Sequence, residues 1–147
     1  VGQGQRGGQA GQPALAMRAG HHLLQQAQGQ QARHDGGAKT CAQGGFCKVG
    51  DTGPGGGIVF YAAQTLQPWG QYMEVSKQTL DTRFDTMWCD VLPTAKFPNA
   101  DAIGNGRATT EFYAKACKRG QLRIATDLVQ GGYDDWHLPT PADAKQM

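Results

Sequence analysis

The sequence predicts a small disulfide-bonded α+β domain that is truncated at its C-terminus and follows a disordered N-terminal tail. Three observations support this fold class: a glycine-rich turn that leads into an apolar run, four cysteines, and several helix-capping residues near the end. With 147 residues, the chain is long enough for one domain with its own core. We expect residues 1–39 to form the tail and residues 40–147 to form the incomplete domain.

The tail is predicted from composition. Residues 1–39 are dominated by Gln, Gly and Ala and contain almost no aromatic or β-branched side chains. Such a segment cannot bury enough apolar area to offset the conformational entropy lost on ordering. At most, residues 14–33 favour a transient helix. His21, His22 and His34 lack a suitably spaced carboxylate or thiolate, so we predict no metal site here.

The domain begins with a turn and a hairpin. The turn contains Gly53, Pro54, Gly55, Gly56 and Gly57, and Ile58 to Tyr61 follow it. Proline and glycine favour a tight turn, and the β-branched and aromatic run favours a strand. Residues 71–76 alternate between apolar and polar and predict the second strand of a hairpin. The turn is not a phosphate loop, because it lacks that motif's Lys and precedes a strand rather than a helix.

The cysteines predict two disulfide bonds. Cys41, Cys47, Cys89 and Cys117 are not spaced as a zinc site, which would need short cysteine pairs or histidine partners. Of the three possible pairings we favour Cys41 with Cys47 and Cys89 with Cys117. Four reduced thiols in a cytosolic protein are the alternative. Disulfides would place the domain outside the cytoplasm.

Two helices are predicted in the C-terminal third. Thr109 or Thr110 is a suitable N-cap for a helix that reaches Arg119 and ends at Gly120. A second short helix is expected over residues 122–129, because its apolar side chains recur at helical spacing.

Apolar anchors and a third capping signature complete the fold prediction. Trp88, Trp136 and Leu138 are expected to pack in the core, with residues 87–92 as a short strand or a packed loop. Thr140 as N-cap, followed by proline, predicts a third helix. Because barely one turn follows, we expect the domain to continue beyond the given sequence.

Charge and composition limit the functional classes. The net charge of +2 is too small to indicate nucleic-acid binding, and no apolar run approaches the roughly 20 residues of a membrane span. No combination of Ser, His, Cys and carboxylate residues predicts catalysis, and no cofactor motif is present. We therefore expect neither an enzyme nor a cofactor.

Two groups of basic residues are candidate ligand contacts. Lys115, Lys118, Arg119 and Arg123 lie along one predicted helix and the turn after it. They are suited to the sulfates or carboxylates of an acidic glycan, with an ordinary solvated helix face as the alternative. Arg107 follows two glycines at a predicted helix N-terminus, which favours anion binding, with a plain tight turn as the alternative.

Several motifs together resemble a known family. They are VGDTGPGGGIVFY at residues 49–61, the pair Trp88 and Cys89, AIGNGRATT at residues 102–110, and GGYDDWHLPTPAD at residues 131–143, which includes Pro139. In this order they resemble the domain of unknown function 1566, also called the C-terminal domain of the Legionella collagen-like adhesin. The resemblance covers roughly residues 48–147.

The resemblance implies a secreted or surface-exposed bacterial domain similar to C-type lectins. The adhesin domain binds sulfated glycosaminoglycans and forms trimers. For this chain we expect a non-enzymatic adhesion module for acidic or sulfated polysaccharide. The alternative is a structural or assembly domain of a larger envelope or phage-tail protein. The sequence does not imply a trimer, because no collagen repeat precedes the domain, and it predicts no other oligomeric state.

Overall fold

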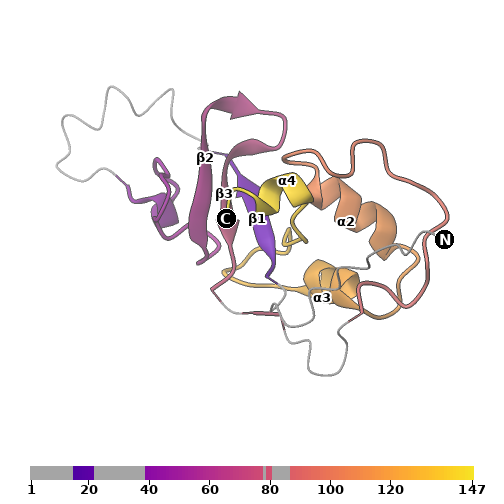
Figure 1. Cartoon of the computed structure of the whole chain (residues 1–147). Coiled ribbons are helices and arrows are strands. Elements are labelled where there is room, and N and C mark those ends of the chain that lie inside the picture. Colours follow the sequence, from indigo (N-terminus) through magenta and orange to yellow (C-terminus); the bar gives the residue numbers. More distant parts are fainter. Residues whose placement is uncertain (1–14, 22–38, 78, 81–86) are drawn as a thin grey trace.

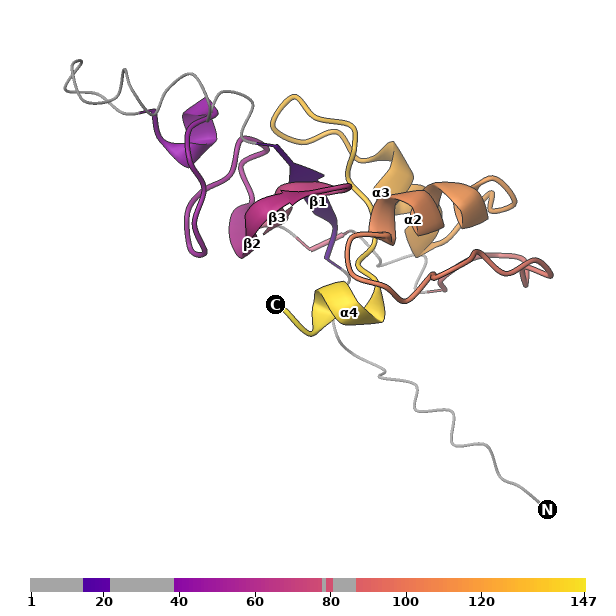
Figure 2. The same cartoon turned by 90° about the horizontal axis from the view of Figure 1, so that it is seen from above.

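The computed structural model describes residues 15–21, 39–77, 79–80 and 87–147 (Figure 1). Its elements are β1 (Met17–Gly20), the 3-10 helix η1 (Cys41–Gln43), β2 (Ile58–Gln67), β3 (Gly70–Val75), α2 (Gly106–Ala114), α3 (Gln121–Asp127) and α4 (Pro141–Ala144). The described chain is therefore an α+β structure, as predicted. Helices α2 and α3 lie together on one side of the sheet (Figures 1 and 2).

The sheet has three antiparallel strands in the order β1, β3, β2. The predicted hairpin of β2 and β3 is confirmed, with Ile58 opposite Val75 and Gln67 opposite Gly70 at the turn. β2 is longer than predicted because the chain stays extended as far as Gln67, with irregular register before the turn.

The prediction of a disordered tail over residues 1–39 is wrong for residues 15–21. The transient helix predicted over residues 14–33 is also wrong for Met17–Gly20, which form the strand β1. Met17 lies opposite Val75, and Met17 also exchanges two backbone hydrogen bonds with His137, each 2.8 Å long. Met17 is fully buried and Arg18 nearly so. Pairing with distant segments therefore stabilises a strand that its own composition does not favour. The rest of the predicted tail, apart from Lys39, lies outside the described residues.

The first predicted helix is displaced. α2 begins at Gly106, with Asn105 as N-cap, and not after Thr109 or Thr110. The hydroxyl of Thr110 instead accepts a hydrogen bond from the backbone N–H of Leu138 at 3.0 Å. α2 ends at Ala114, before Arg119.

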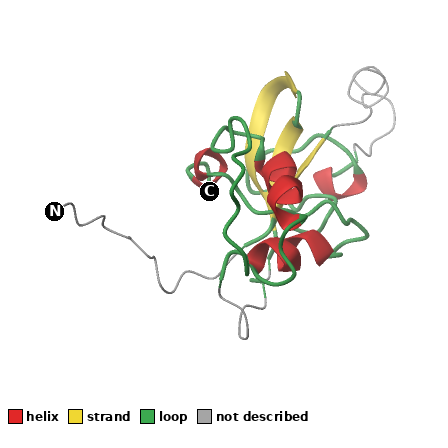
Figure 3. Ribbon diagram, turned by 90° about the vertical axis from the view of Figure 1, so that its right-hand side faces the viewer, coloured by secondary structure: helices red, strands yellow, loops and turns green. Residues whose placement is uncertain are grey.

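The other two helices agree with the prediction. α3 covers most of the expected range. In α4, the Thr140 side chain accepts a hydrogen bond from Asp143 N and the Asp143 carboxylate accepts one from Thr140 N, each at 3.0 Å. Between α3 and α4, residues 128–140 form a long loop with only isolated β-bridges. Loops are drawn in green in Figure 3.

Both predicted disulfides are present. Cys41 is bonded to Cys47, and Cys89 is bonded to Cys117. The first bond packs with β2 and β3, and Cys117 packs with α2 and α3. Each bond therefore fixes a loop to a different part of the core.

The anchor predictions are confirmed in part. Trp136 is buried and packs against α3, and Leu138 is half-buried between two core clusters. Trp88 is not a core residue, because it is 42% exposed. Its ring makes an edge contact with Tyr113, at 5.2 Å between centroids. Residues 87–92 form a loop and not a strand, but the loop is not packed, because most of its side chains are exposed.

Candidate functional site

A cleft of about 550 Å³ lies between the start of α2, the end of β1 and the segment that precedes α4. Aromatic and charged side chains line much of it: Arg18, His21, Trp69, Tyr72, Arg107, Glu111, Tyr133, Asp135 and His137. Ligand sites in proteins commonly have this size and combine aromatic walls with a few polar groups. The cleft is therefore the candidate functional site.

Arg18 is the centre of a buried charge cluster at the floor of the cleft. Its Nε and Nη2 donate to the two carboxylate oxygens of Asp135 at 2.9 and 3.2 Å, and its Nη1 donates to Glu74 Oε1 at 2.6 Å. Both Arg18 and Glu74 are almost completely buried. Burial opposes a charged guanidinium, but the hydrogen bonds that Arg18 donates to Asp135 and Glu74 outweigh it and raise the pKa of Arg18 above its usual value.

The glycine-rich turn completes this cluster. The Glu74 carboxylate accepts hydrogen bonds from the backbone N–H groups of Gly55 and Gly57 at 3.0 and 2.9 Å. A Cβ at position 53 would overlap the Glu74 carboxylate, and one at position 55 would lie 2.8 Å from Arg18 Cδ. The turn therefore needs glycines in order to surround an internal carboxylate.

The turn also contacts the segment that carries Trp136. A Cβ at position 55 would lie 2.8 Å from Trp136 Cζ2, and one at Gly131 would overlap the carbonyl of Gly55. Two motifs that are far apart in the sequence thus pack directly against each other.

Tyr133 and Tyr72 both contact Arg18. The Arg18 guanidinium lies 3.8 Å from the centroid of the Tyr133 ring, a cation–π contact. Burial raises the pKa of Tyr72, and Arg18 Nη1 approaches its hydroxyl at 3.4 Å. Tyr133 is 37% exposed, so one buried cation orients an aromatic ring at the surface of the cleft.

Trp69 lines another part of the cleft. It lies in the hairpin turn between β2 and β3, and its ring is tilted against Tyr61 with 5.8 Å between centroids. A Cβ at Gly104 would overlap the Trp69 ring, so the tryptophan rests directly on the backbone that leads into α2.

Arg107 projects from the first turn of α2 and is exposed. Its Nε donates to Glu111 Oε1 at 2.9 Å, and this hydrogen bond raises the pKa of Arg107. Exposed ion pairs of this kind stabilise a helix by only about 0.3–0.5 kcal/mol. A competing anion could therefore displace Glu111 at little cost.

The predicted anion site at the start of α2 already contains an internal carboxylate. Asp143, which is fully buried, accepts a hydrogen bond from Gly104 N at 2.8 Å as well as from Thr140 N. A plain tight turn, the alternative to an anion site, is present before α2, because Asn105 N donates to the carbonyl of Ala102 at 3.2 Å. An added anion at Gly104 is excluded by this contact.

The predicted basic set does not form one free face. Arg123 turns inward, and its Nη2 donates to the carbonyls of Ala114 and Cys117 at 2.6 and 3.1 Å, which caps the C-terminus of α2. Lys115 and Lys118 are exposed. Arg107 is about 12 Å away from this end along the helix. Arg119, the remaining member of the basic set, is also exposed. The structure thus places Arg107 at the cleft and the four cations of the basic set away from it.

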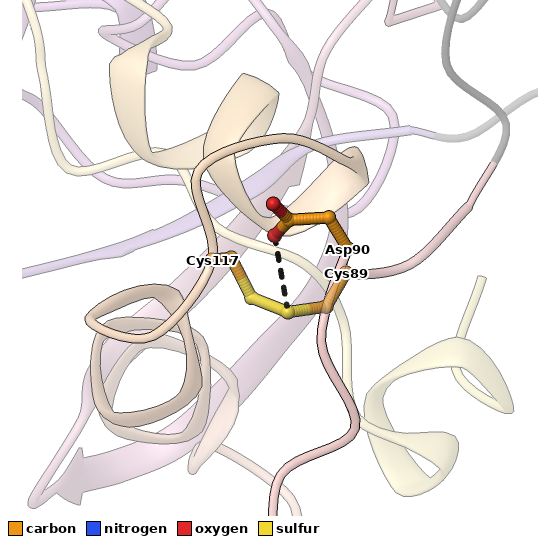
Figure 4. Close-up of side chains that lie close together, drawn as sticks. All are labelled: Cys89, Asp90 and Cys117. Carbon is orange, nitrogen blue, oxygen red and sulfur yellow. Dashed lines mark hydrogen bonds between the residues drawn. A yellow bond between two sulfur atoms is a disulfide. The ribbon is translucent and has the colours of Figure 1, made fainter.

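Cys89, Asp90 and Cys117 form a group with the spacing of metal ligands (Figure 4). Both sulfurs belong to a disulfide bond, so neither can be the thiolate that a metal would bind. Asp90 accepts a hydrogen bond from Lys118 N at 2.9 Å, and this bond lowers the pKa of Asp90. The group therefore fixes the loop to the end of α2.

Sequence reasoning missed most of the cleft. Arg18 lay within the predicted tail, and Trp69 and Tyr133 lay in turns without a recognised signal. The ion pair of Asp135 has no local signal, because its partner Arg18 is 117 residues away. The only local signal for β1 was a short apolar run in a Gln- and Gly-rich segment.

Comparisons with family models, curated proteins and solved structures find no match to this chain. Among the described residues, no helix has the length and apolar character needed to span a membrane. The class defined by the fold is a small α+β domain with two disulfides, a three-stranded sheet and a cleft beside a buried charge cluster.

Proposed function

We propose that this domain is a non-enzymatic, extracellular or cell-surface binding module that holds an acidic saccharide in the cleft. The observation that carries the proposal is the pairing of two exposed or half-exposed aromatic rings, Trp69 and Tyr133, with the cation of Arg107 around one cavity. Flat apolar surfaces suit the faces of sugar rings, and a guanidinium suits a carboxylate or sulfate.

The buried charges support binding rather than catalysis. Arg18, Glu74 and Asp135 satisfy one another, and they fix the orientation of Tyr133. Preorganised walls reduce the entropy lost when a ligand binds. The two disulfides are consistent with an oxidising compartment, which supports the extracellular assignment.

Titration calorimetry with a heparin-derived oligosaccharide tests this function. We expect Tyr133→Ala and Arg107→Gln each to weaken binding about tenfold, because a stacking or charge-assisted contact contributes on the order of 1–2 kcal/mol. Lys115→Ala and Lys118→Ala, at the far end of α2, serve as matched controls and should bind normally. Normal binding by both cleft variants would exclude the cleft as the binding site. A loss of binding confined to the lysine variants would instead support the predicted basic set as the ligand contact.

A second candidate function is structural assembly. The loop at residues 87–92 exposes four large apolar side chains, and Leu92 is 93% exposed. Exposed apolar clusters often mark protein interfaces. Sedimentation analysis would distinguish the two functions: a stable oligomer that Leu92→Asp dissociates, together with no saccharide affinity, would favour assembly.

A further inference from the structure

The inner wall of the cleft contains a buried imidazole that is not fully hydrogen-bonded. His137 is 2% exposed and lines the cleft. Its Nδ1 lies 3.0 Å from the carbonyl oxygen of Asp135, which can only accept, so Nδ1 carries the proton. Within the described part of the chain, no hydrogen bond reaches Nε2. The neutral ring therefore leaves a bare acceptor in a buried position.

The first turn of α2 supplies unpaired donors. The first N–H groups of any helix lack partners inside the helix. Among the residues that the structure describes, no acceptor is found for the backbone N–H groups of Gly106, Arg107 and Ala108. Arg107 and Ala108 line the same cleft as His137. α2 has nine residues, so its N-terminus also carries a partial positive charge.

The His137 ring lies against the first residue of α2. A Cβ at position 106 would lie 2.8 Å from His137 Cδ2, the ring atom bonded to Nε2. Buried polar atoms in native proteins are nearly always hydrogen-bonded, and an unsatisfied one is costly. The arrangement therefore indicates a group that donates to Nε2 and accepts from the helix.

We infer that this inner end of the cleft is a hydroxyl-binding subsite, in which His137 Nε2 accepts a hydrogen bond from a saccharide hydroxyl whose oxygen faces the N-terminus of α2. The inference rests on the proposed function and specifies it. A sulfate or an ionised carboxylate has no proton to donate, so it leaves Nε2 unsatisfied. The subsite thus binds a hydroxyl, and Arg107 at the mouth is left for the acidic substituent.

Nitrogen NMR tests the subsite directly. In two-bond proton–nitrogen spectra of labelled protein, Nε2 of His137 should resonate as an unprotonated nitrogen. A heparin-derived oligosaccharide should move that resonance toward the hydrogen-bonded acceptor range, and inorganic sulfate should not. A resonance that stays in place at saturating oligosaccharide would overturn the inference, because Nε2 would then face water only. The wild-type protein is used, so folding of a variant does not enter.

A variant provides the second measurement. His137→Asn keeps a side-chain N–H for the Asp135 carbonyl but removes the Nε2 acceptor. We expect it to bind the oligosaccharide roughly tenfold more weakly, the effect of one lost buried hydrogen bond. Asp134→Asn, an exposed change in the same segment that does not line the cleft, is the control. Thermal denaturation establishes that both variants fold.

The outcomes separate this inference from the proposed function. If Tyr133→Ala loses binding and His137→Asn binds normally, the subsite is wrong and the cleft remains the binding site. If neither variant changes the affinity, the subsite and the cleft as binding site are both wrong. Weaker binding in both variants, with the nitrogen shift, supports both.

Discussion

Two segments of this chain, the turn at residues 53–57 and the entry to α2 at residues 104–108, both combine glycines with N–H groups that face negative charge. In the first, the N–H groups of Gly55 and Gly57 are bound by the Glu74 carboxylate. In the second, only Gly104 N has an internal carboxylate, that of Asp143. Arg107 and Ala108, whose N–H groups have no acceptor among the described residues, line the cleft.

The difference lies in what the rest of the chain supplies. β3 brings a carboxylate into the turn and β1 brings Arg18 to neutralise it, so this segment is structural. At the entry to α2, Asp143 accepts from Gly104 N and the carbonyl of Ala102 accepts from Asn105 N. Among the described residues, no acceptor is found for the next three N–H groups, at residues 106–108. Glycines and N–H groups alone thus do not distinguish a structural turn from a ligand site, because the number of internal acceptors decides it.

The largest effect is expected from breaking the structural cluster. Arg18→Met should lower the free energy of unfolding by about 3–5 kcal/mol, because it leaves the buried Glu74 carboxylate without its cation. Urea denaturation measures the change. Arg107→Met, which removes an exposed cation, is the control and should cost less than about 0.5 kcal/mol. Equal costs would show that the turn is not organised by the buried pair.

The second-largest loss of stability is expected when the internal acceptor at the entry to α2, Asp143, is removed. Asp143→Ala leaves the N–H groups of Thr140 and Gly104 without partners, and we expect a loss of about 2–3 kcal/mol. Asp134→Ala, at an exposed position, should be close to neutral in the same urea experiment. A neutral Asp143→Ala would mean that water replaces the carboxylate and that the entry to α2 is open to external anions.

A smaller change sharpens the role of the turn. Gly55→Ala introduces a Cβ within 2.8 Å of both Arg18 and Trp136, and overpacking of this kind costs about 1–3 kcal/mol. Gly56 has φ +78° and nothing within 4 Å of its Cβ position, so Gly56→Asn, which tolerates this conformation, should cost less than about 1 kcal/mol. Thermal unfolding of the two variants gives the comparison. The reverse order would contradict close packing around Glu74.

Stability should also depend on pH through His137. Burial lowers its pKa below the usual 6.5, against smaller opposing effects of Asp135 and Asp143. The unfolded chain then binds a proton that the folded chain does not, so stability is greatest above pH 6.5 and falls as the pH decreases below it. The slope from this residue is at most about 1.4 kcal/mol per pH unit. Urea denaturation between pH 5 and pH 8 should show a weaker slope for His137→Asn, and an identical slope would contradict a buried neutral imidazole.

The smallest effect on stability is expected at the mouth of the cleft. Glu111→Gln removes the exposed partner of Arg107 and should cost less than about 0.5 kcal/mol. Because it also frees the guanidinium, it should strengthen binding of the heparin-derived oligosaccharide in calorimetry. Weaker binding would indicate that Glu111, and not Arg107, contacts the ligand.

Local chemistry made much of the fold predictable. The hairpin, both disulfides and the capping box of Thr140 and Asp143 all depend on neighbouring residues or on the cysteine count, and all are confirmed. The turn at residues 53–57 was also located correctly, although its acceptor, Glu74, was not.

Long-range contacts account for what was missed. Arg18 in β1 is bound by partners 54 to 117 residues away, so the composition of the segment alone predicted a tail. The start of α2 was placed too late because Thr110 looks like a cap but binds Leu138 instead. The cleft could not be predicted because its walls come from separate segments spread from Arg18 to His137, and none of them is distinctive in isolation.

The position of Arg18 has a practical consequence for dissecting the protein. A fragment cut at the apparent composition boundary near Lys39 would leave the buried Glu74 carboxylate and the partly buried Asp135 carboxylate without a counter-ion, and it would expose one edge of β3. Such a fragment should recover its cooperative unfolding when a synthetic peptide that contains residues 15–21 is added in trans, as a missing strand that completes the sheet.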